Sequence, residues 1–327
     1  MRNKLKILCT APMHFLEHLK DRLEENFEVT YAFRDSYNDI KNIIAGFDGW
    51  IVNPGADYKV DADLIYNAKK LKIIISPSTG SDHIDLDQCQ KNNIYFDCLK
   101  GKESIIKNIH ASAEFSFTLL MAMLRKLPES LDSAKNGFWR EVEDEFRGIE
   151  LSGKTVGLIG YGRIGKKMAK YCLAFGAKVI ITDPNVDVDS KDVKKVDLET
   201  LLTSSDIVCI HVHLDESSKN MFGAREFSLM KKDSYFLNTA RGGIVDESAL
   251  IESLKNNHLK AAAVDVISNE QSSDFSNHPM IKHARNNRNL MVSPHIAGLT
   301  VDSQEKAALF AIEQLEAYFT SNNSFTQ

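Results

Sequence analysis

The segment at residues 151–184 constrains the fold of this chain more than any other. Residues 155–159 are a short apolar run of strand length, and three glycines, Gly160, Gly162 and Gly165, follow at G-x-G-x-x-G spacing. Apolar side chains then recur at helical spacing before a second apolar run of strand length. The pattern predicts a strand, a tight turn, a helix and a parallel strand, which together make one crossover unit of a doubly wound sheet.

Each glycine of this turn has a physical task if the turn binds a dinucleotide. Gly160 allows the tight turn, Gly162 lets a pyrophosphate approach the backbone, and Gly165 lets the helix pack closely on the strand. The first helical residues, Arg163 and Ile164, offer unpaired N–H groups to the phosphates. We therefore predict that these five residues contact the cofactor.

An acidic residue, Asp183, closes the second strand about 20 residues after the glycines. A carboxylate at this place accepts hydrogen bonds from the adenosine ribose and repels a 2′-phosphate, so the sequence favours NAD over NADP. Glycines at this spacing also arise by chance in loops. The strand before them, the helix after them and the acid together favour dinucleotide binding.

Length, charge and cysteine content limit the classes of protein to which the chain can belong. The 327 residues suffice for two domains with separate cores, and the net charge of −5 argues against binding of nucleic acid. The N-terminus lacks the apolar core of a signal peptide, and the longest apolar run is too short to span a bilayer. The five cysteines form no C-x-x-C pair, which argues against disulfides and zinc. We expect a cytoplasmic protein with no membrane partner.

Strand-like and helical segments alternate along the chain, which predicts an α/β fold with parallel sheets. The expected strands outside the glycine segment are residues 5–10, 27–33, 49–52, 71–76, 207–214, 234–239, 259–266 and 290–293. A long apolar helix is expected at 109–127 and another from Pro128 toward Trp139. These two helices fit either a bridging or dimer-forming role or simple core packing.

Two further polar segments are candidates for ligand contact. The loop at residues 77–86 follows a strand and has small residues at Ser78, Thr79 and Gly80, where open N–H groups suit an anion such as a carboxylate; it also fits a plain connection. His211 and His213 point to one face of their predicted strand, a spacing that metals use. No carboxylate or cysteine lies nearby in the sequence to complete a set of metal ligands, so we expect no metal. We place His211 near the cofactor instead.

Polar groups with complementary chemistry stand at predicted strand ends in the second half of the chain: Arg241, Asp265, Glu270 and His295. Reduction of a 2-oxo acid needs a cation that holds the carboxylate, and Arg241 stays charged. It also needs an acid for the new alkoxide, and His295 titrates in the right range. A paired carboxylate, for which Glu270 is the candidate, orients the ring and raises its pKa. Each residue alone also fits a structural role, but their shared position favours catalysis.

In the order and spacing of its motifs the chain resembles the D-isomer-specific 2-hydroxyacid dehydrogenase family over nearly its whole length. The matching motifs are T-G-S-D-H-I-D-L at 79–86, G-L-I-G-Y-G-R-I-G at 157–165, N-T-A-R-G-G-I-V-D-E at 238–247, V-D-V-I-S-N-E at 264–270 and S-P-H-I-A-G at 293–298. The resemblance implies an NAD-binding Rossmann domain at 103–296, inserted in a flavodoxin-like substrate domain at 1–102 and 297–327. It also implies a homodimer, a small 2-oxo or 2-hydroxy acid as substrate, and a short form without a regulatory domain.

The resemblance also assigns roles to particular residues. The implied catalytic residues are Arg241, Glu270 and His295. The implied donors to the substrate carboxylate are Ser78, Thr79 and Gly80. The residues implied at the nicotinamide end are Thr239, Ala240 and Asp265.

Three departures from the usual pattern of the family, at four positions, leave the substrate open among glyoxylate, hydroxypyruvate, pyruvate and 3-phosphoglycerate. Gln271 and His213 each stand where a proline is common, and the loop before Thr79 carries Pro77 and Ser78. A formate dehydrogenase is a second enzyme interpretation, but such a relative pairs its histidine with glutamine, where this chain has Glu270. An NAD(H)-sensing, corepressor-like binding protein on the same fold is the alternative that is not an enzyme.

Overall fold

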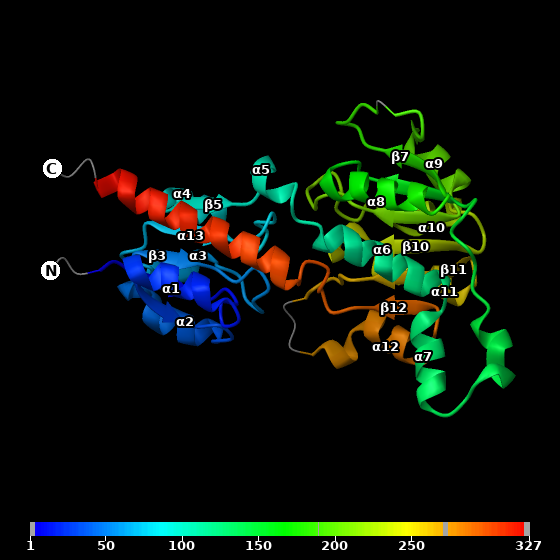
Figure 1. The fold of residues 1–327 in the computed structure, drawn as a ribbon, viewed down its shortest axis with the longest axis horizontal. Coiled ribbons are helices and arrows are strands. Elements are labelled where there is room, and N and C mark those ends of the chain that lie inside the picture. The colour runs from blue at the N-terminus through cyan, green and yellow to red at the C-terminus, as the bar shows by residue number, and fades with distance from the viewer. Residues whose placement is uncertain (1–3, 189, 271–273, 324–327) are drawn as a thin grey trace. The chain divides into compact units, whose positions relative to one another are not determined.

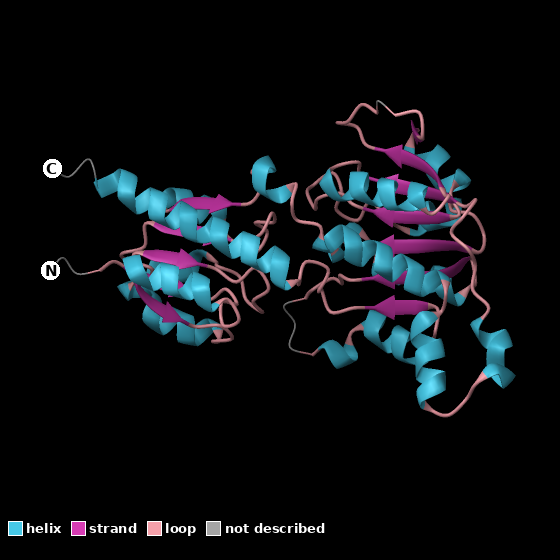
Figure 2. Ribbon diagram, viewed as in Figure 1, coloured by secondary structure: helices cyan, strands magenta, loops and turns pink. Residues whose placement is uncertain are grey.

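The structure is a computed structural model that describes residues 4–188, 190–270 and 274–323. The chain divides into two compact units, one of Met1–Ile109 with Leu299–Gln327 and one of His110–Gly298. Each unit contains one parallel sheet with helices on both faces (Figures 1 and 2). This arrangement confirms the predicted α/β fold with two doubly wound sheets.

The first unit has a five-stranded sheet in the order β2-β1-β3-β4-β5. This is the flavodoxin-like order, and its direction reverses between β1 and β3. Its elements are β1 (Lys6–Cys9), α1 (Glu17–Asn26), β2 (Glu28–Tyr31), α2 (Tyr37–Ile43), η1 (Ile44–Gly46), β3 (Gly49–Ile51), α3 (Ala62–Asn67), β4 (Ile73–Ser76), α4 (Leu86–Lys91), β5 (Tyr95–Cys98), α5 (Glu103–Ile106) and α13 (Val301–Asn323).

Alternate side chains of the first sheet enter two separate cores, as expected for strands buried on both faces. Ile7, Ile51 and Ile73 pack with α1 and the C-terminal helix α13. Leu8 and Trp50 pack on the opposite face with α2, α3 and α4. The last helix of the chain is therefore part of the core of the first unit.

The second unit has a seven-stranded sheet in the order β12-β11-β10-β9-β6-β7-β8, with every neighbouring pair parallel. Counted from β6, this is the Rossmann order with one added edge strand. Its elements are α6 (Ala111–Leu124), α7 (Leu127–Lys135), η2 (Arg140–Phe146), β6 (Thr155–Ile159), α8 (Arg163–Ala174), β7 (Lys178–Thr182), β8 (Val193–Lys195), α9 (Leu198–Ser204), β9 (Ile207–Ile210), α10 (Ala224–Leu229), β10 (Ser234–Asn238), η3 (Gly242–Ile244), α11 (Glu247–Lys255), β11 (Leu259–Val264), η4 (Phe275–Asn277), α12 (Pro279–Asn286) and β12 (Leu290–Val292).

The second sheet is also covered on both faces. Helices α6 and α8 pack on one face, where Leu120 and Met168 meet Leu158 in one core. Helices α9 to α12 cover the other face around Phe236 and Leu250. The carboxyl ends of the strands are thereby left to the connecting loops, which carry most of the predicted site residues.

The structure corrects two expectations about helices and strands. The strand expected at 207–214 ends at Ile210, so His211 and His213 lie in a loop; His211 is half-buried and His213 is exposed. They do not share the face of a strand. The helix expected to run from Pro128 toward Trp139 ends at Lys135, and a 3₁₀ segment follows.

No helix in the part of the chain that the structure describes has both the length and the apolar character needed to cross a membrane.

Shortening Leu315 to Ala should destabilise the first unit by about 2–5 kcal/mol, the usual cost of a cavity in a close-packed core. Leu315 is fully buried in α13, and its Cδ1 lies 3.0 Å from the point where a Cβ on Gly49 would stand. Unfolding in guanidinium can be followed through buried Trp50, with the exposed Trp139 replaced by Phe. Val301→Ala in the same helix is the control, because Val301 is 61% exposed. Equal loss of stability in the two variants would contradict the role of α13.

Candidate active site

The carboxyl edge of the second sheet presents the predicted site residues in spatial order. Strands β7, β6, β9, β10, β11 and β12 are successive neighbours in this sheet. The residues that follow them are, in that order, Asp183, Gly160, His211, Thr239 with Arg241, Asp265 with Glu270, and His295. In open parallel sheets ligands bind along this edge, so one elongated ligand can reach several of these groups.

The glycine turn has the geometry that a phosphate site needs. Gly160 has a φ of 92°, a conformation that favours glycine, and a Cβ there would lie 2.6 Å from the carbonyl oxygen of His211. A Cβ on Gly165 would overlap the carbonyl oxygen of Gly160, so only glycine lets α8 approach the turn this closely. A Cβ on Gly162 would enter open space. Backbone is therefore accessible at Gly162, next to Arg163 and Ile164 in the first turn of the 12-residue helix α8.

The carboxylate of Asp183 holds the glycine turn against the end of β7. Its Oδ2 accepts a hydrogen bond from the Tyr161 amide at 2.8 Å, and its Oδ1 accepts from the Asn185 amide at 2.8 Å. A carboxylate oxygen has two lone pairs, so each oxygen keeps acceptor capacity. Asp183 thus orders the turn and can still accept hydrogen bonds from a ribose.

His211 lies beside the glycine turn with a neutral, unpaired ring nitrogen. Its amide donates to Ile159 O at 2.7 Å. Its Nε2 is buried and has no hydrogen-bond partner in the described part of the chain. Burial lowers the pKa of His211 to about 4, so the ring is uncharged near neutral pH. A buried polar atom without a partner is costly, and a bound ligand at this edge would satisfy it.

The turn after β10 is held by side-chain hydrogen bonds. Asn238 Oδ1 accepts from the Ala240 amide at 3.0 Å, and its Nδ2 donates to Arg241 O at 2.9 Å. Thr239 Oγ1 lies 2.6 Å from Ser116 Oγ of α6. Because Ser116 Oγ donates to the backbone oxygen of Ser112 at 2.6 Å, Thr239 is the donor in its bond to Ser116. The Thr239 oxygen therefore keeps only acceptor capacity for a ligand.

Asp265 organises the loop that carries His295. Its buried carboxylate accepts hydrogen bonds from Ser293 Oγ at 2.6 Å, the Ile296 amide at 3.0 Å and the Ala297 amide at 2.8 Å. Its backbone oxygen accepts from the His295 amide at 2.8 Å. His295 has a φ of 52°, which is uncommon for a residue with a side chain. These bonds fix the loop in that conformation and account for much of the acceptor capacity of Asp265.

His295 and Glu270 form a charge-assisted pair. His295 Nδ1 lies 2.5 Å from Glu270 Oε2, while Glu270 Oε1 accepts from the Ile267 amide at 3.1 Å. The His295 side chain is 46% exposed, and its Nε2 has no partner within the described residues. The ring is thus oriented by Glu270 through one nitrogen, and the other nitrogen is accessible to a substrate.

The hydrogen bond to Glu270 raises the pKa of His295 above its ordinary value of 6.5, against the opposing effect of burial. The negative charge of Glu270 acts in the same direction, the positive charge of Arg241 opposes it, and Asp265 adds a smaller increase. The structure thus brings Arg241, Asp265, Glu270 and His295 into one electrostatic neighbourhood. The outcome is an imidazolium that persists to higher pH than that of an ordinary histidine.

The predicted carboxylate loop belongs to the first unit, directly after β4. Ser78 Oγ donates to Gly80 O at 2.8 Å and lies 2.9 Å from Ser76 Oγ, which in turn lies 3.1 Å from His83 Nε2. Within the described chain the amides of Thr79 and Gly80 donate to no acceptor. The loop is thus stiffened by side chains and keeps two free N–H donors, as an anion site requires.

Several structural details of the site were not anticipated from the sequence. Glu247 and His278 hold the loop before Glu270 through Ser268. Among the described residues, no three His, Cys, Asp or Glu side chains gather where they could hold a metal ion. The departure at Gln271 lies outside the described residues. Glu247 is the last residue of the N-T-A-R-G-G-I-V-D-E motif, but nothing in the sequence indicated which loop its side chain reaches.

Replacing Glu270 by Gln should lower the pKa of His295, because the effects of burial and of Arg241 are then opposed only by the smaller effect of Asp265. An NMR titration of the imidazole measures this, with His295→Gln assigning the resonance. The raised pKa also means that the ion pair stabilises the fold fully below the ordinary histidine value and loses this effect as pH rises through the raised value. The two proteins should therefore differ in melting temperature at pH 6 and converge at high pH. An unchanged pKa would refute the pairing.

Comparison with known proteins assigns the family. Residues 117–297 match the family model for the NAD-binding domain of D-isomer specific 2-hydroxyacid dehydrogenases. The D-3-phosphoglycerate dehydrogenase of Archaeoglobus fulgidus is 34% identical over 95% of this chain and 56% of its own length, so the chain spans little more than half of that relative. The glyoxylate reductase of Thermococcus litoralis is 34% identical over 80% of this chain and 77% of its own length.

A solved structure agrees with this assignment. The NAD-dependent formate dehydrogenase of Staphylococcus aureus, solved in complex with NAD, matches with a TM-score of 0.83 at 29% identity, covering 96% of each chain. The chain therefore belongs to the D-isomer-specific 2-hydroxyacid dehydrogenase family.

Proposed function

We propose that the protein is an NAD-dependent D-2-hydroxyacid dehydrogenase that interconverts a small 2-oxo acid and its 2-hydroxy acid. The observation that carries this proposal is the pair of His295 and Glu270, with Arg241 close enough to influence the pKa of His295. These groups stand on the sheet edge that also bears the glycine turn. Family membership and relatives named as phosphoglycerate dehydrogenase and glyoxylate reductase support it.

The second unit holds the cofactor in this proposal. The open backbone at Gly162 and the start of α8 receive the pyrophosphate, and Asp183 accepts hydrogen bonds from the adenosine ribose. The unpaired Nε2 of His211 and the acceptor oxygen of Thr239 serve the remainder of the dinucleotide. Bound NADH supplies the hydride that C2 of the 2-oxo acid accepts.

His295 acts as the acid in reduction and as the base in oxidation. Glu270 holds the ring through Nδ1, so the proton on Nε2 goes to the oxygen on C2 as negative charge develops there. The raised pKa keeps His295 charged for this step to higher pH than an ordinary histidine. Glu270 also compensates the positive charge in the ground state, as the carboxylate does in other acid–base pairs.

Arg241 binds the substrate carboxylate in this proposal. The guanidinium of Arg241 is a planar fork that matches a carboxylate and polarises the neighbouring carbonyl. In the first unit, the free amides of Thr79 and Gly80 are by themselves a proposed carboxylate site, in a loop that Ser78 stiffens. The first unit is thus the substrate domain, and the second the cofactor domain.

Turnover tests the proposal directly. NADH oxidation is measured by its absorbance with glyoxylate, hydroxypyruvate and pyruvate, and NAD reduction is measured with 3-phosphoglycerate. Arg241→Ala and His295→Ala should each lower kcat by about 10²–10⁴-fold, the usual contribution of such groups, while fluorescence titration shows NADH binding retained. Absence of turnover in the wild type despite NADH binding would favour the sensing alternative and overturn the proposal.

We also propose that the protein is a homodimer joined through α7 and the segment after it. None of the α7 side chains, all of which the structure describes, is buried. Leu131, Phe138 and Trp139 are 53%, 53% and 72% exposed. Adjacent exposed apolar residues on this scale mark an interaction surface, and a second copy of this chain offers the same apolar surface.

Leu131→Asp should convert the dimer to a monomer, because a charge at the centre of an apolar interface is costly to bury. Sedimentation velocity measures the mass of each species. Tyr66→Asp, on a side chain of the first unit that is 68% exposed, is the matched control and should leave the dimer intact. A wild-type monomer, or a dimer in both variants, would exclude this interface.

A cytoplasmic location completes the proposal. All five cysteines are described, buried and unpaired. Free thiols are typical of proteins in reducing compartments.

A further inference from the structure

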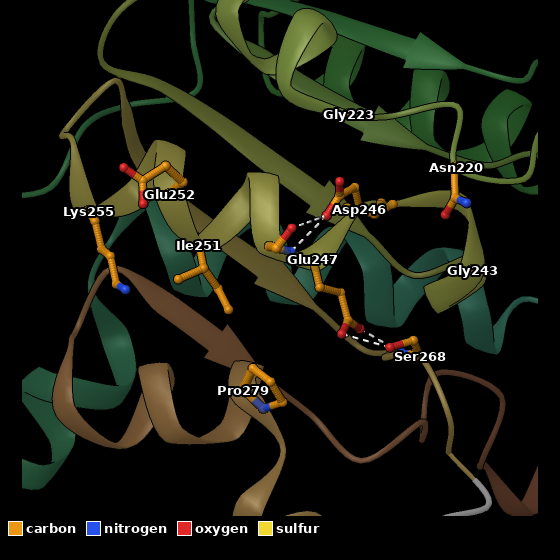
Figure 3. Close-up of a pocket in the computed structure, with 12 residues that line it drawn as sticks. Asn220, Gly223, Gly243, Asp246, Glu247, Ile251, Glu252, Lys255, Ser268 and Pro279 are labelled. Carbon is orange, nitrogen blue, oxygen red and sulfur yellow. Dashed lines mark hydrogen bonds between the residues drawn. The ribbon is translucent and has the colours of Figure 1, made fainter.

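The carboxylate of Glu247 is committed to a loop outside its own helix. Glu247 is the first residue of α11, and its side chain is 13% exposed. One oxygen accepts from the Ser268 amide at 2.5 Å and the other from Ser268 Oγ at 2.8 Å. Figure 3 shows both bonds at the edge of a pocket that Ile251 and Pro279 also line. Asp246 caps the helix by accepting from the amides of Ser248 and Ala249, which leaves Glu247 free to reach Ser268.

His278 completes the hold on Ser268. Its Nε2 donates to the Ser268 carbonyl oxygen at 3.1 Å and lies 3.5 Å from Glu247 Oε2. Its Nδ1 accepts from the Met280 amide at 3.3 Å, which assigns the proton to Nε2. Its side chain is only 9% exposed. The amide, hydroxyl and carbonyl of Ser268 are therefore all engaged by groups from α11 and the start of α12.

Ser268 belongs to the loop that bears Glu270, and this loop packs against the one that bears Arg241. It precedes Glu270 by two residues, and Asn269 between them has a φ of 55°. A Cβ on Gly242, the residue after Arg241, would overlap the backbone where Ile267 joins Ser268. Glu247 begins α11, at the end of the connection from β10 that carries Arg241. Its bonds to Ser268 thus tie the loop of Arg241 to the loop of Glu270.

We propose that Glu247 is a positioning residue that sets the place of the Glu270 carboxylate, and hence its pairing with His295, by holding Ser268. The inference rests on the proposed function for its effect on turnover, but not for its effect on the pair itself. Displacing a catalytic group by about 1 Å can cost about 10²-fold in rate. Glu247 touches none of the proposed substrate or cofactor contacts, so its loss changes kcat and leaves binding of NADH unchanged.

The test uses three variants and one matched control in the full-length protein. Glu247→Ala removes both acceptors. Glu247→Gln keeps one acceptor for the Ser268 amide but none for the hydroxyl, and Ser268→Ala removes only the hydroxyl. Glu252→Gln is the control, because Glu252 lies on α11, lines the same pocket and bonds only to Asn256 of its own helix among the described residues.

The first readout needs no turnover. NMR titration of His295 should show its pKa lowered toward 6.5 in Glu247→Ala, by less in Glu247→Gln and not at all in Glu252→Gln. The charged groups that act on His295 are Glu270, Arg241 and Asp265, and these variants leave all three in place. A lowered pKa therefore reports a displaced Glu270 and not a lost charge beside the ring.

The second readout is kinetic. Glu247→Ala should lower kcat by about 10- to 100-fold, with KM for NADH unchanged and the limb of the pH profile that reports His295 shifted to lower pH. Glu247→Gln and Ser268→Ala should have smaller effects. Their double variant should be no worse than the more affected single variant, because both remove the same contact.

The outcomes separate this inference from the proposed function. A wild-type His295 pKa in folded Glu247→Ala overturns the inference, whether or not the protein turns over a 2-oxo acid. A lowered pKa with no wild-type turnover supports the positioning role while the proposed reaction fails. If Glu247→Ala does not fold, the test relies on Glu247→Gln and Ser268→Ala. The inference is overturned if the pKa of His295 in both of these variants equals its pKa in the control Glu252→Gln.

Discussion

The buried carboxylate of Asp265 is the interaction on which the geometry of the candidate site depends. A carboxylate away from water is tolerated only when its oxygens are satisfied, and here one hydroxyl and two amides of the following loop satisfy them. The same three bonds bend that loop and hold His295 at a positive φ. Because the loop holds the ring of His295 in one place, Nδ1 meets Glu270 and Nε2 remains accessible to a substrate.

The parallel sheet places these groups along one line. Each β-α crossover returns the chain in the same direction, so every strand ends at the same edge and contributes one loop there. Adjacent loops are then joined to one another: Asp265 donates its amide to Asn238 O, and Glu247 reaches Ser268. The glycine turn and the pair of His295 and Glu270 therefore share one support.

The predictions that succeeded depended on local geometry. A strand, three glycines at fixed spacing and a helix dictate one turn, because only glycine tolerates the conformation at Gly160 and the close approach at Gly165. The expected strand at 207–214 was wrong because apolar alternation continues past the point where pairing with the neighbouring strands ends. The contact between Glu247 and Ser268 could not be predicted from the sequence, because Ser268 follows 21 residues later, in a different loop.

The sequence by itself determined the fold class, the glycine turn and the identity of Glu270 and His295, the two residues that pair in the candidate site. The period of apolar residues, the spacing of the glycines and the types of the polar residues suffice for these predictions, because each acts within one element or one turn. Only the tertiary structure decided that Asp265 holds the loop of His295, that Asp183 anchors the glycine turn, and that the Nε2 of His211 is buried without a partner among the described residues. These features depend on which loops become neighbours when the strands pair, and strand order is a property of the folded sheet rather than of any local segment.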